Sequence, residues 1–218
     1  MVDNSVTNKL AEVAERISEI LDNKDLKVID GYVQLNRPEG VDPNSVGLAK
    51  TTASSDNLII MTPIPESEAL PFGDVKVLAD GIHQYLQDNQ GLIEVKTGAT
   101  ALIAGYAYCV IKTLKDEGGV EYQVTMDLDK GDHVLHIEGF FSEIGTTGQR
   151  EAIILNNAIE QGVINPSTMV GWASDPYDKL FTRGQLMNLS EREEYDVHFA
   201  GHPLTELRAF IKFIISNN

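Results

Sequence analysis

The sequence has very little cysteine and tryptophan, one residue of each, and it has no long apolar run. A membrane-spanning helix needs about 20 consecutive apolar residues, so the pattern excludes one. The single cysteine, Cys109, cannot form an intrachain disulfide, and no cation adjoins it to activate the thiol. We therefore interpret Cys109 as a small buried side chain in an apolar strand. The first residues lack the basic and apolar regions of a signal peptide, which predicts a cytoplasmic location.

Positive charge is also scarce. The 218 residues include 17 Lys and Arg against 33 Asp and Glu, which gives a formal net charge of -16. The acidic excess is spread along the chain and repels the phosphates of nucleic acids and anionic lipids, so we expect neither nucleic-acid nor membrane binding. The excess either serves solubility alone, which is the simpler interpretation, or selects a basic protein partner.

Hydrophobic periodicity predicts an α+β protein in which helices cover an antiparallel sheet. Helical spacing occurs over residues 5–22, in a stretch that Asp74 caps, and after Pro203. The helix after Asp74 is expected to have an apolar stripe of Val77, Leu78, Ile82, Tyr85 and Leu86. The runs that predict strands are 28–35, 47–51, 57–62, 92–96, 100–114, 120–128 and 133–141. Short turns between the last of these runs indicate a meander.

The rest of the fold is expected to depend on residues 133–163. This stretch begins as an alternating strand, breaks at the glycine turn 145–148 and continues as a helix that Gly162 is placed to end. The strand is expected to turn Leu135, Ile137 and Phe141 toward one face. We interpret 1–218 as a single domain that consists of an N-terminal helix (1–27), the sheet with its helices (28–163), and a wrapping segment with a final helix (164–218).

The element order over about residues 28–163 resembles the PsbP-like fold. The resemblance rests on a meander whose last strand passes through Gly139-Phe140-Phe141 into the turn Gly145-Thr-Thr-Gly-Gln-Arg150-Glu151 and a helix. Photosystem II extrinsic proteins, the yeast Ran-binding Mog protein and bacterial relatives share this fold. The resemblance implies an α/β/α sandwich on an antiparallel sheet, and binding or scaffolding more often than catalysis.

The glycine turn is a candidate anion site. Thr146, Thr147, Gly148 and Arg150 would supply backbone N–H groups at a helix start and a guanidinium. The spacing and lysine of a P-loop are absent, so nucleotide binding is not indicated. The favoured alternative is structural: a threonine hydroxyl caps the helix, and Arg150 pairs with a nearby carboxylate such as Glu143 or Glu151.

No motif nominates catalytic residues, a metal site or a cofactor. His198 and His202 have the spacing of helical metal ligands, but Gly201 and Pro203 argue against a continuous helix there. No nucleophile elbow occurs, and Ser142 lies near His136 only in sequence. Catalysis is therefore left open, with a non-enzymatic role favoured.

The segment after residue 164 is irregular and rich in large apolar side chains. These are Trp172, Tyr177, Phe181, Met187, Tyr195 and Phe199. Such a segment either wraps the core, the favoured interpretation, or forms a partner surface.

Three functional hypotheses follow from these observations. The first is a non-enzymatic protein-binding or scaffolding domain that uses the aromatic segment. The second is a small-ligand or anion-binding protein, or an enzyme, with a cleft near Arg150. The third is an acidic immunity or chaperone-type inhibitor of a basic protein, whose binding would weaken with salt.

Overall fold

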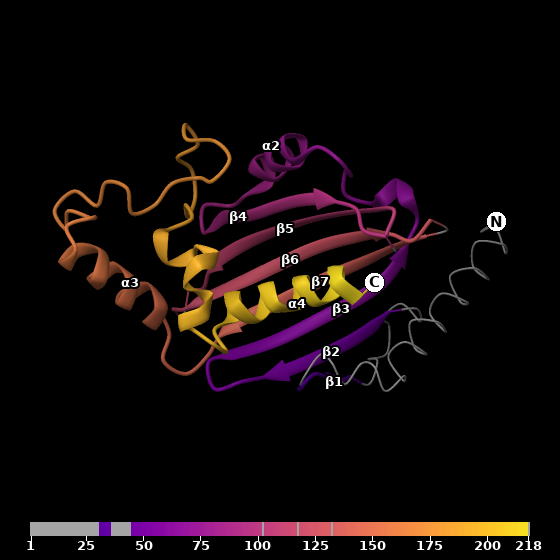
Figure 1. Cartoon of the computed structure of the whole chain (residues 1–218), viewed down its shortest axis with the longest axis horizontal. Helices are drawn as coiled ribbons and strands as arrows, with labels where there is room; N and C mark the ends of the chain where they lie inside the picture. The colour runs from indigo at the N-terminus through magenta and orange to yellow at the C-terminus, as the bar shows by residue number, and fades with distance from the viewer. Residues whose placement is uncertain (1–30, 36–44, 102, 117, 132, 218) are drawn as a thin grey trace.

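A computed structural model describes residues 31–35, 45–101, 103–116, 118–131 and 133–217. Within these residues, one seven-stranded sheet has the order β1-β2-β3-β7-β6-β5-β4, with every neighbouring pair antiparallel (Figure 1). The strands are β1 (Val33–Gln34), β2 (Val46–Thr51), β3 (Ser55–Ile64), β4 (Gln90–Gly98), β5 (Gly105–Leu114), β6 (Val120–Asp129) and β7 (Val134–Glu143). The predicted antiparallel sheet is confirmed.

Three α-helices lie around this sheet in the described part of the chain. They are α2 (Val75–Tyr85), α3 (Gln149–Glu160) and α4 (Pro203–Asn217), and short 3-10 helices occur at η2 (Glu66–Glu68), η3 (Leu189–Glu191) and η4 (Glu193–His198). Helix α4 runs across the middle of the sheet and packs on β3, β6 and β7 (Figure 1). Helix α2 packs on β4. The α+β class with a final helix on the sheet is confirmed.

The two helices cover opposite faces of the sheet, as the alternation along β5 shows. Tyr108 and Val110 belong to the large core cluster under α4, whereas Ala107 and Cys109 belong to the cluster under α2. Neighbouring side chains of a strand point to opposite faces, so the two clusters lie on either side of the sheet. Cys109 is 5% exposed, and burial raises the pKa of its thiol to about 11.

The central strand, turn and helix form as the sequence predicts. The strand residues Leu135, Ile137 and Phe141 are buried in the core under α4. Gly148 then adopts a left-handed conformation with a φ of 72°, and α3 follows directly. Gly162, with a φ of 70°, lies just beyond the end of α3. Both glycines occupy conformations that a side chain would strain.

The predicted N-cap of helix α2 is confirmed, but its predicted apolar stripe is partly wrong. The Asp74 side chain accepts from the backbone N–H groups of Lys76 and Val77. However, Val77 is 56% exposed and Tyr85 is 83% exposed, so both were wrongly placed on the apolar face. The helix lies near the β4 edge and contacts little of the sheet, so a narrower stripe is sufficient.

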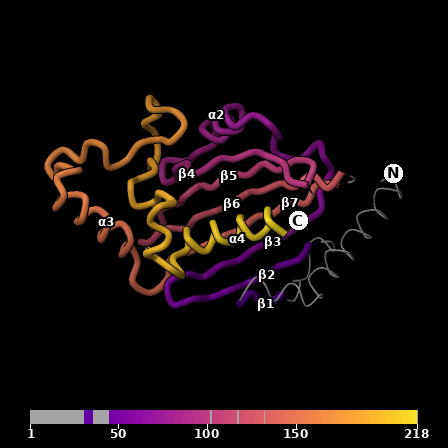
Figure 2. Tube along the Cα trace, in the orientation of Figure 1, coloured from indigo at the N-terminus to yellow at the C-terminus, as the bar shows by residue number. Residues whose placement is uncertain are grey.

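The segment between α3 and α4 wraps the β4 edge. Figure 2 shows it leaving α3, passing the start of β4 and returning to α4. The Gln185 N–H donates to the Gln90 carbonyl at 2.7 Å. A Cβ on Gly91 would lie 1.5 Å from the Gln185 carbonyl oxygen, so only glycine permits this approach. The segment therefore shields an edge that could otherwise pair with another chain.

Three predictions fall wholly or partly outside the described residues. The helix expected at 5–22, the N-terminal segment 1–27 and the first residues of the strand 28–35 lie outside the described residues. Of that strand, Val33–Gln34 is observed as β1. None of the helices in the described stretches combines the length and hydrophobicity needed to traverse a bilayer.

Candidate functional site

A cavity of about 300 Å³ lies where β5, β6 and the start of α3 meet the wrapping segment. This volume is at the lower end of the range for ligand pockets. Its lining combines charged, polar and aromatic side chains: Lys112, Leu114, Val120, Tyr122, Glu143, Gly148, Arg150, Glu151, Trp172, Ala173, Gln185, Leu186, Asn188, Ser190, Glu191 and His202.

A buried ion pair forms one wall of the cavity. The Nζ of Lys112 on β5 lies 2.7 Å from Oε2 of Glu191, and the two side chains are 5% and 2% exposed. The hydroxyl of Tyr122 donates to Oε1 of Glu191 at 3.1 Å, and the N–H of Asn188 donates to Oε2 at 2.7 Å. Burial, together with Glu191, raises the pKa of Tyr122 well above its usual value, so this hydroxyl remains a donor.

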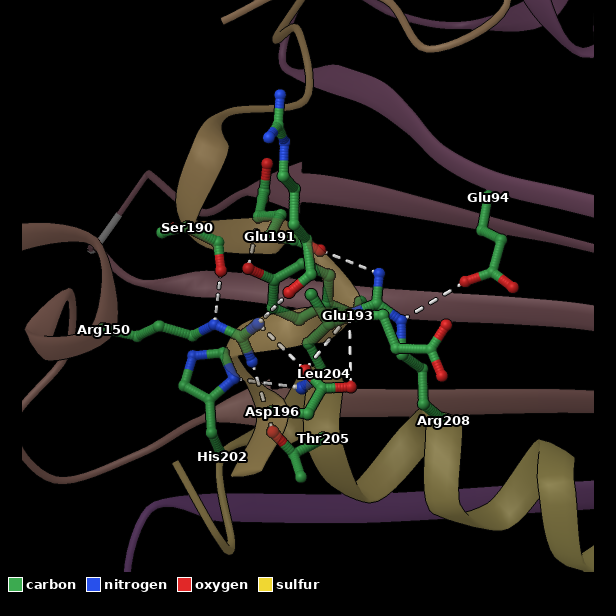
Figure 3. Close-up of polar contacts among 12 residues, drawn as sticks. Glu94, Arg150, Ser190, Glu191, Glu193, Asp196, His202, Leu204, Thr205 and Arg208 are labelled. Atoms are coloured by element: carbon green, nitrogen blue, oxygen red, sulfur yellow. Dashed lines mark hydrogen bonds and ion pairs between the residues drawn. The ribbon is translucent and has the colours of Figure 1, made fainter. Parts of the chain in front are cut away.

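Arg150 joins the start of α3 to the wrapping segment and to α4. Its Nε donates to the Ser190 carbonyl at 2.6 Å, Nη2 to the Arg192 carbonyl at 3.0 Å, and Nη1 to the Thr205 hydroxyl at 3.2 Å (Figure 3). Its Nη2 also lies 2.9 Å from Asp196 Oδ1. Each guanidinium nitrogen therefore already has a protein acceptor, and the side chain is 2% exposed.

The expected local role of Arg150 is corrected by these contacts. It pairs with Asp196, which is distant in sequence, instead of Glu143 or Glu151. Threonine capping of α3 is also wrong, because the N-cap residue is Gly148 and no side chain caps it. The Gly148 N–H donates to the Glu143 carboxylate instead, at 3.2 Å from Oε1. Anion binding by Thr146, Thr147, Gly148 and Arg150 remains a prediction, and an anion would have to compete with these contacts.

A second arginine extends this network toward β4. Arg208 on α4 places Nη1 at 3.1 Å from Asp196 Oδ1, donates from Nη2 to the Glu191 carbonyl at 2.8 Å, and has Nε at 3.3 Å from Glu94 Oε2 (Figure 3). Asp196 thus lies between Arg150 and Arg208. The 189–196 stretch is irregular and has few backbone hydrogen bonds to the sheet. Side chains from α3 and α4 hold it in place through this network.

His202 and Glu143 also line the cavity. The His202 Nδ1 accepts from the Leu204 N–H at 3.2 Å, so the proton of the neutral ring is on Nε2, which lies 3.4 Å from Glu143 Oε1. Burial lowers the pKa of His202, which keeps the ring neutral near pH 7. Burial opposes ionisation of Glu143, but its hydrogen bonds to His202, Gly148 and Val120 give it a net lowered pKa.

The residues of the predicted partner surface mostly face inward. Trp172 is 8% exposed and packs with α3, and Phe181 stacks on His83 at 4.2 Å between ring centroids. Met187 and Tyr195 pack partly buried against core clusters. Tyr177 is 38% exposed, and its hydroxyl bonds both backbone groups of Val95. The segment thus wraps the core, and partner binding by these residues stays a prediction.

The other candidate catalytic and metal-binding side chains lie apart from one another or already have protein partners. The Ser142 hydroxyl donates to Glu121, while His136 contacts Asp127, so no serine–histidine pair forms. The described residues contain no group of three His, Cys, Asp or Glu side chains arranged to hold a metal. His202 contacts Glu143 and does not face a helical partner at His198.

Sequence reasoning missed Lys112, Glu191 and the pair of His83 with Asp175, which lie 2.8 Å apart. One signal could have located the first: Lys112 has the same strand register as Tyr108 and Val110, which face the core. A lysine at such a position requires a buried counter-charge. The partner itself, Glu191, carries no comparable signal.

His136 provides a pH-dependent prediction. Its Nδ1 lies 2.6 Å from Asp127 Oδ1, and the hydrogen bond to Asp127 raises the pKa of His136. The stabilisation is therefore complete below the unfolded pKa, about 6.5, and is lost as the pH rises through the higher folded pKa. We expect His136→Gln to cost about 1 kcal/mol of unfolding free energy near pH 5.5 and much less near pH 8.5, as measured by urea denaturation. An equal cost at both pH values would contradict this assignment.

Comparison with known proteins gives a distant structural likeness. No family model matches the sequence, and no curated protein matches it. The solution structure of cyanobacterial PsbP (CyanoP) from Synechocystis sp. PCC 6803 is similar with a TM-score of 0.36 and 13% identity, covering 61% of this chain and 80% of that chain. A likeness this distant says nothing about function. The chain thus has a weak PsbP-like resemblance, as its element order predicts.

Proposed function

We propose that this chain is a non-enzymatic binding domain for a basic protein. The proposal depends on the balance of charges in the interior. Among the described residues, the buried cations Lys112, Arg150 and Arg208 are matched in number by the buried carboxylates Asp127, Asp175 and Glu191. Burial among the described residues therefore removes none of the acidic excess that these residues carry, and their share of the net charge of -16 is left for the surface. Such a surface favours encounter with a positively charged partner.

The contacts of Lys112, Arg150 and His202 support a binding role over catalysis by these three groups. General acid–base or nucleophilic chemistry needs a group that is free to exchange a proton or attack a substrate. Lys112 and Arg150 are instead held in ion pairs, and the neutral ring of His202 is held by Leu204 and Glu143. These groups stabilise the wrapping segment.

Affinity capture tests the proposal. The full chain is immobilised, exposed to a lysate of the source cells at about 50 mM salt and eluted with a salt step. An unrelated immobilised protein of similar net charge serves as the control for simple ion exchange. We expect a basic protein that the control does not retain. Capture of only neutral or acidic proteins, or the same proteins on both columns, would contradict the proposal.

A further inference from the structure

The cavity contains more negative than positive charge once its ion pairs are assigned. Its lining includes the carboxylates of Glu143, Glu151 and Glu191 and the cations Lys112 and Arg150. Lys112 is paired with Glu191. Arg150 is paired with Asp196, which is not part of the lining. Glu143 and Glu151 are therefore left without a cationic partner, since His202 beside Glu143 is neutral.

Glu151 is the carboxylate most accessible to a ligand. It lies in the exposed first turn of α3, and its hydrogen-bond donors in the described structure are two neutral side chains, the Trp172 indole and Asn188, whose Nδ2 is 3.5 Å away. No ion pair within 4 Å joins it to another described residue. Burial raises its pKa; Lys112 opposes this rise, and Glu191 and Glu143 add to it. A cation at this point would relieve the repulsion among the three carboxylates.

An aromatic ring borders the same space. Trp172 lines the cavity, and its indole N–H donates a hydrogen bond to the Glu151 carboxylate. An indole next to a carboxylate suits a cation carried on an alkyl chain, because the ring contacts the methylene groups and its face attracts the charge. An anion or a wholly apolar ligand would gain nothing from the carboxylates of Glu143 and Glu151, and it would bury Glu151, which is exposed, at a cost.

We propose that this cavity binds an alkylammonium group, and that its source is a lysine side chain of the basic protein partner. The assignment to a lysine rests on the function proposed above, whereas the preference for an alkylammonium group rests on the cavity alone. The ammonium would lie between Glu143 and Glu151, with its methylene groups beside Trp172. The cavity volume of about 300 Å³ accommodates such a side chain.

The only tryptophan of the chain lines the cavity, so intrinsic fluorescence reports on its occupancy. The full chain is titrated with n-butylammonium and with Nα-acetyl-lysine N-methylamide at constant ionic strength. The matched uncharged probes are 1-butanol and the Nε-acetylated lysine derivative. We expect a saturable change in Trp172 emission with both amines and with neither uncharged probe. The proposal would be overturned if the amines and the uncharged probes changed the Trp172 emission equally, or if neither amine changed it.

A matched pair of variants locates the binding group. Glu151→Gln is expected to weaken amine binding about tenfold, the effect of losing one charge-assisted contact. Glu160→Gln removes an exposed carboxylate at the far end of the same helix and is expected to leave binding unchanged. Equal effects of the two variants would show a general charge effect and overturn the assignment to the cavity.

The outcomes separate this inference from the proposed function. Capture of a basic partner without any amine response would overturn the cavity site and leave the binding function standing. An amine response without capture of a basic partner would overturn the proposed function and leave the cavity site standing. Binding of butylammonium without the lysine derivative would overturn the assignment to a lysine side chain and indicate a free small amine.

Discussion

Glu191→Gln is expected to lower the free energy of unfolding by about 3 kcal/mol, because it removes one member of a buried ion pair. Glutamine preserves the shape of the side chain, but Lys112, 5% exposed, keeps its charge and loses its counter-charge. Urea denaturation followed by circular dichroism measures the loss. The affected groups are local, so the slope of the unfolding free energy against urea should not change.

The double variant Lys112→Met/Glu191→Gln isolates the cause of this loss. Removing the unpaired charge should restore at least about 1 kcal/mol relative to Glu191→Gln alone, because a methionine tolerates the buried site better than an isolated ammonium does. A double variant less stable than the single variant would show that packing or the Asn188 and Tyr122 hydrogen bonds, and not the charge pair, dominate at this site.

Arg150→Met is the second change with a large expected effect, again about 3 kcal/mol. It leaves the carbonyls of Ser190 and Arg192 without their donor and removes one of the two arginines beside Asp196. We expect the 189–198 stretch to loosen before the sheet does. Limited proteolysis should therefore cut this stretch first, while β5 and β6 stay protected.

Arg192→Met is the matched control for this variant. Its side chain is 56% exposed and lies 3.9 Å from Glu194, so its loss should cost less than about 0.5 kcal/mol. If the two arginine variants lose the same stability, the network around Arg150 does not hold the wrapping segment as described.

The sheet and the three described helices could be predicted because their signals are local. The alternation in β7, the cap at Asp74 and the glycines that flank α3 each act within a few residues of the element they define. Val77 and Tyr85 show the limit of this reasoning. Helical spacing identifies an apolar stripe, but the width that is buried depends on how much of the sheet the helix contacts.

The contacts of Arg150 and Lys112 could not be predicted in this way. Arg150 has carboxylates close in sequence, yet its partner is Asp196, because the wrapping segment returns past the start of α3. Lys112 and Glu191 are 79 residues apart and meet only after the sheet, α4 and the wrapping segment are assembled. Several carboxylates could have satisfied either cation, so tertiary arrangement decides which one does.

The cavity is likewise a product of tertiary structure. Its walls come from β5, β6, the β7–α3 turn and the wrapping segment, and no single motif marks it. Of the residues that the sequence predicts for an anion site, Gly148 and Arg150 line this cavity, and anion binding there stays a prediction. The excess of carboxylates becomes visible only when the ion pairs are assigned one by one.

The most direct test of the proposed function is the dissociation constant of the purified complex between the full chain and the basic protein that it captures, measured from about 50 to about 300 mM NaCl. An acidic surface that steers a basic partner predicts that the constant rises about tenfold or more over this range, with much of the change in the association rate. A dissociation constant that stays the same across the series would contradict the proposal.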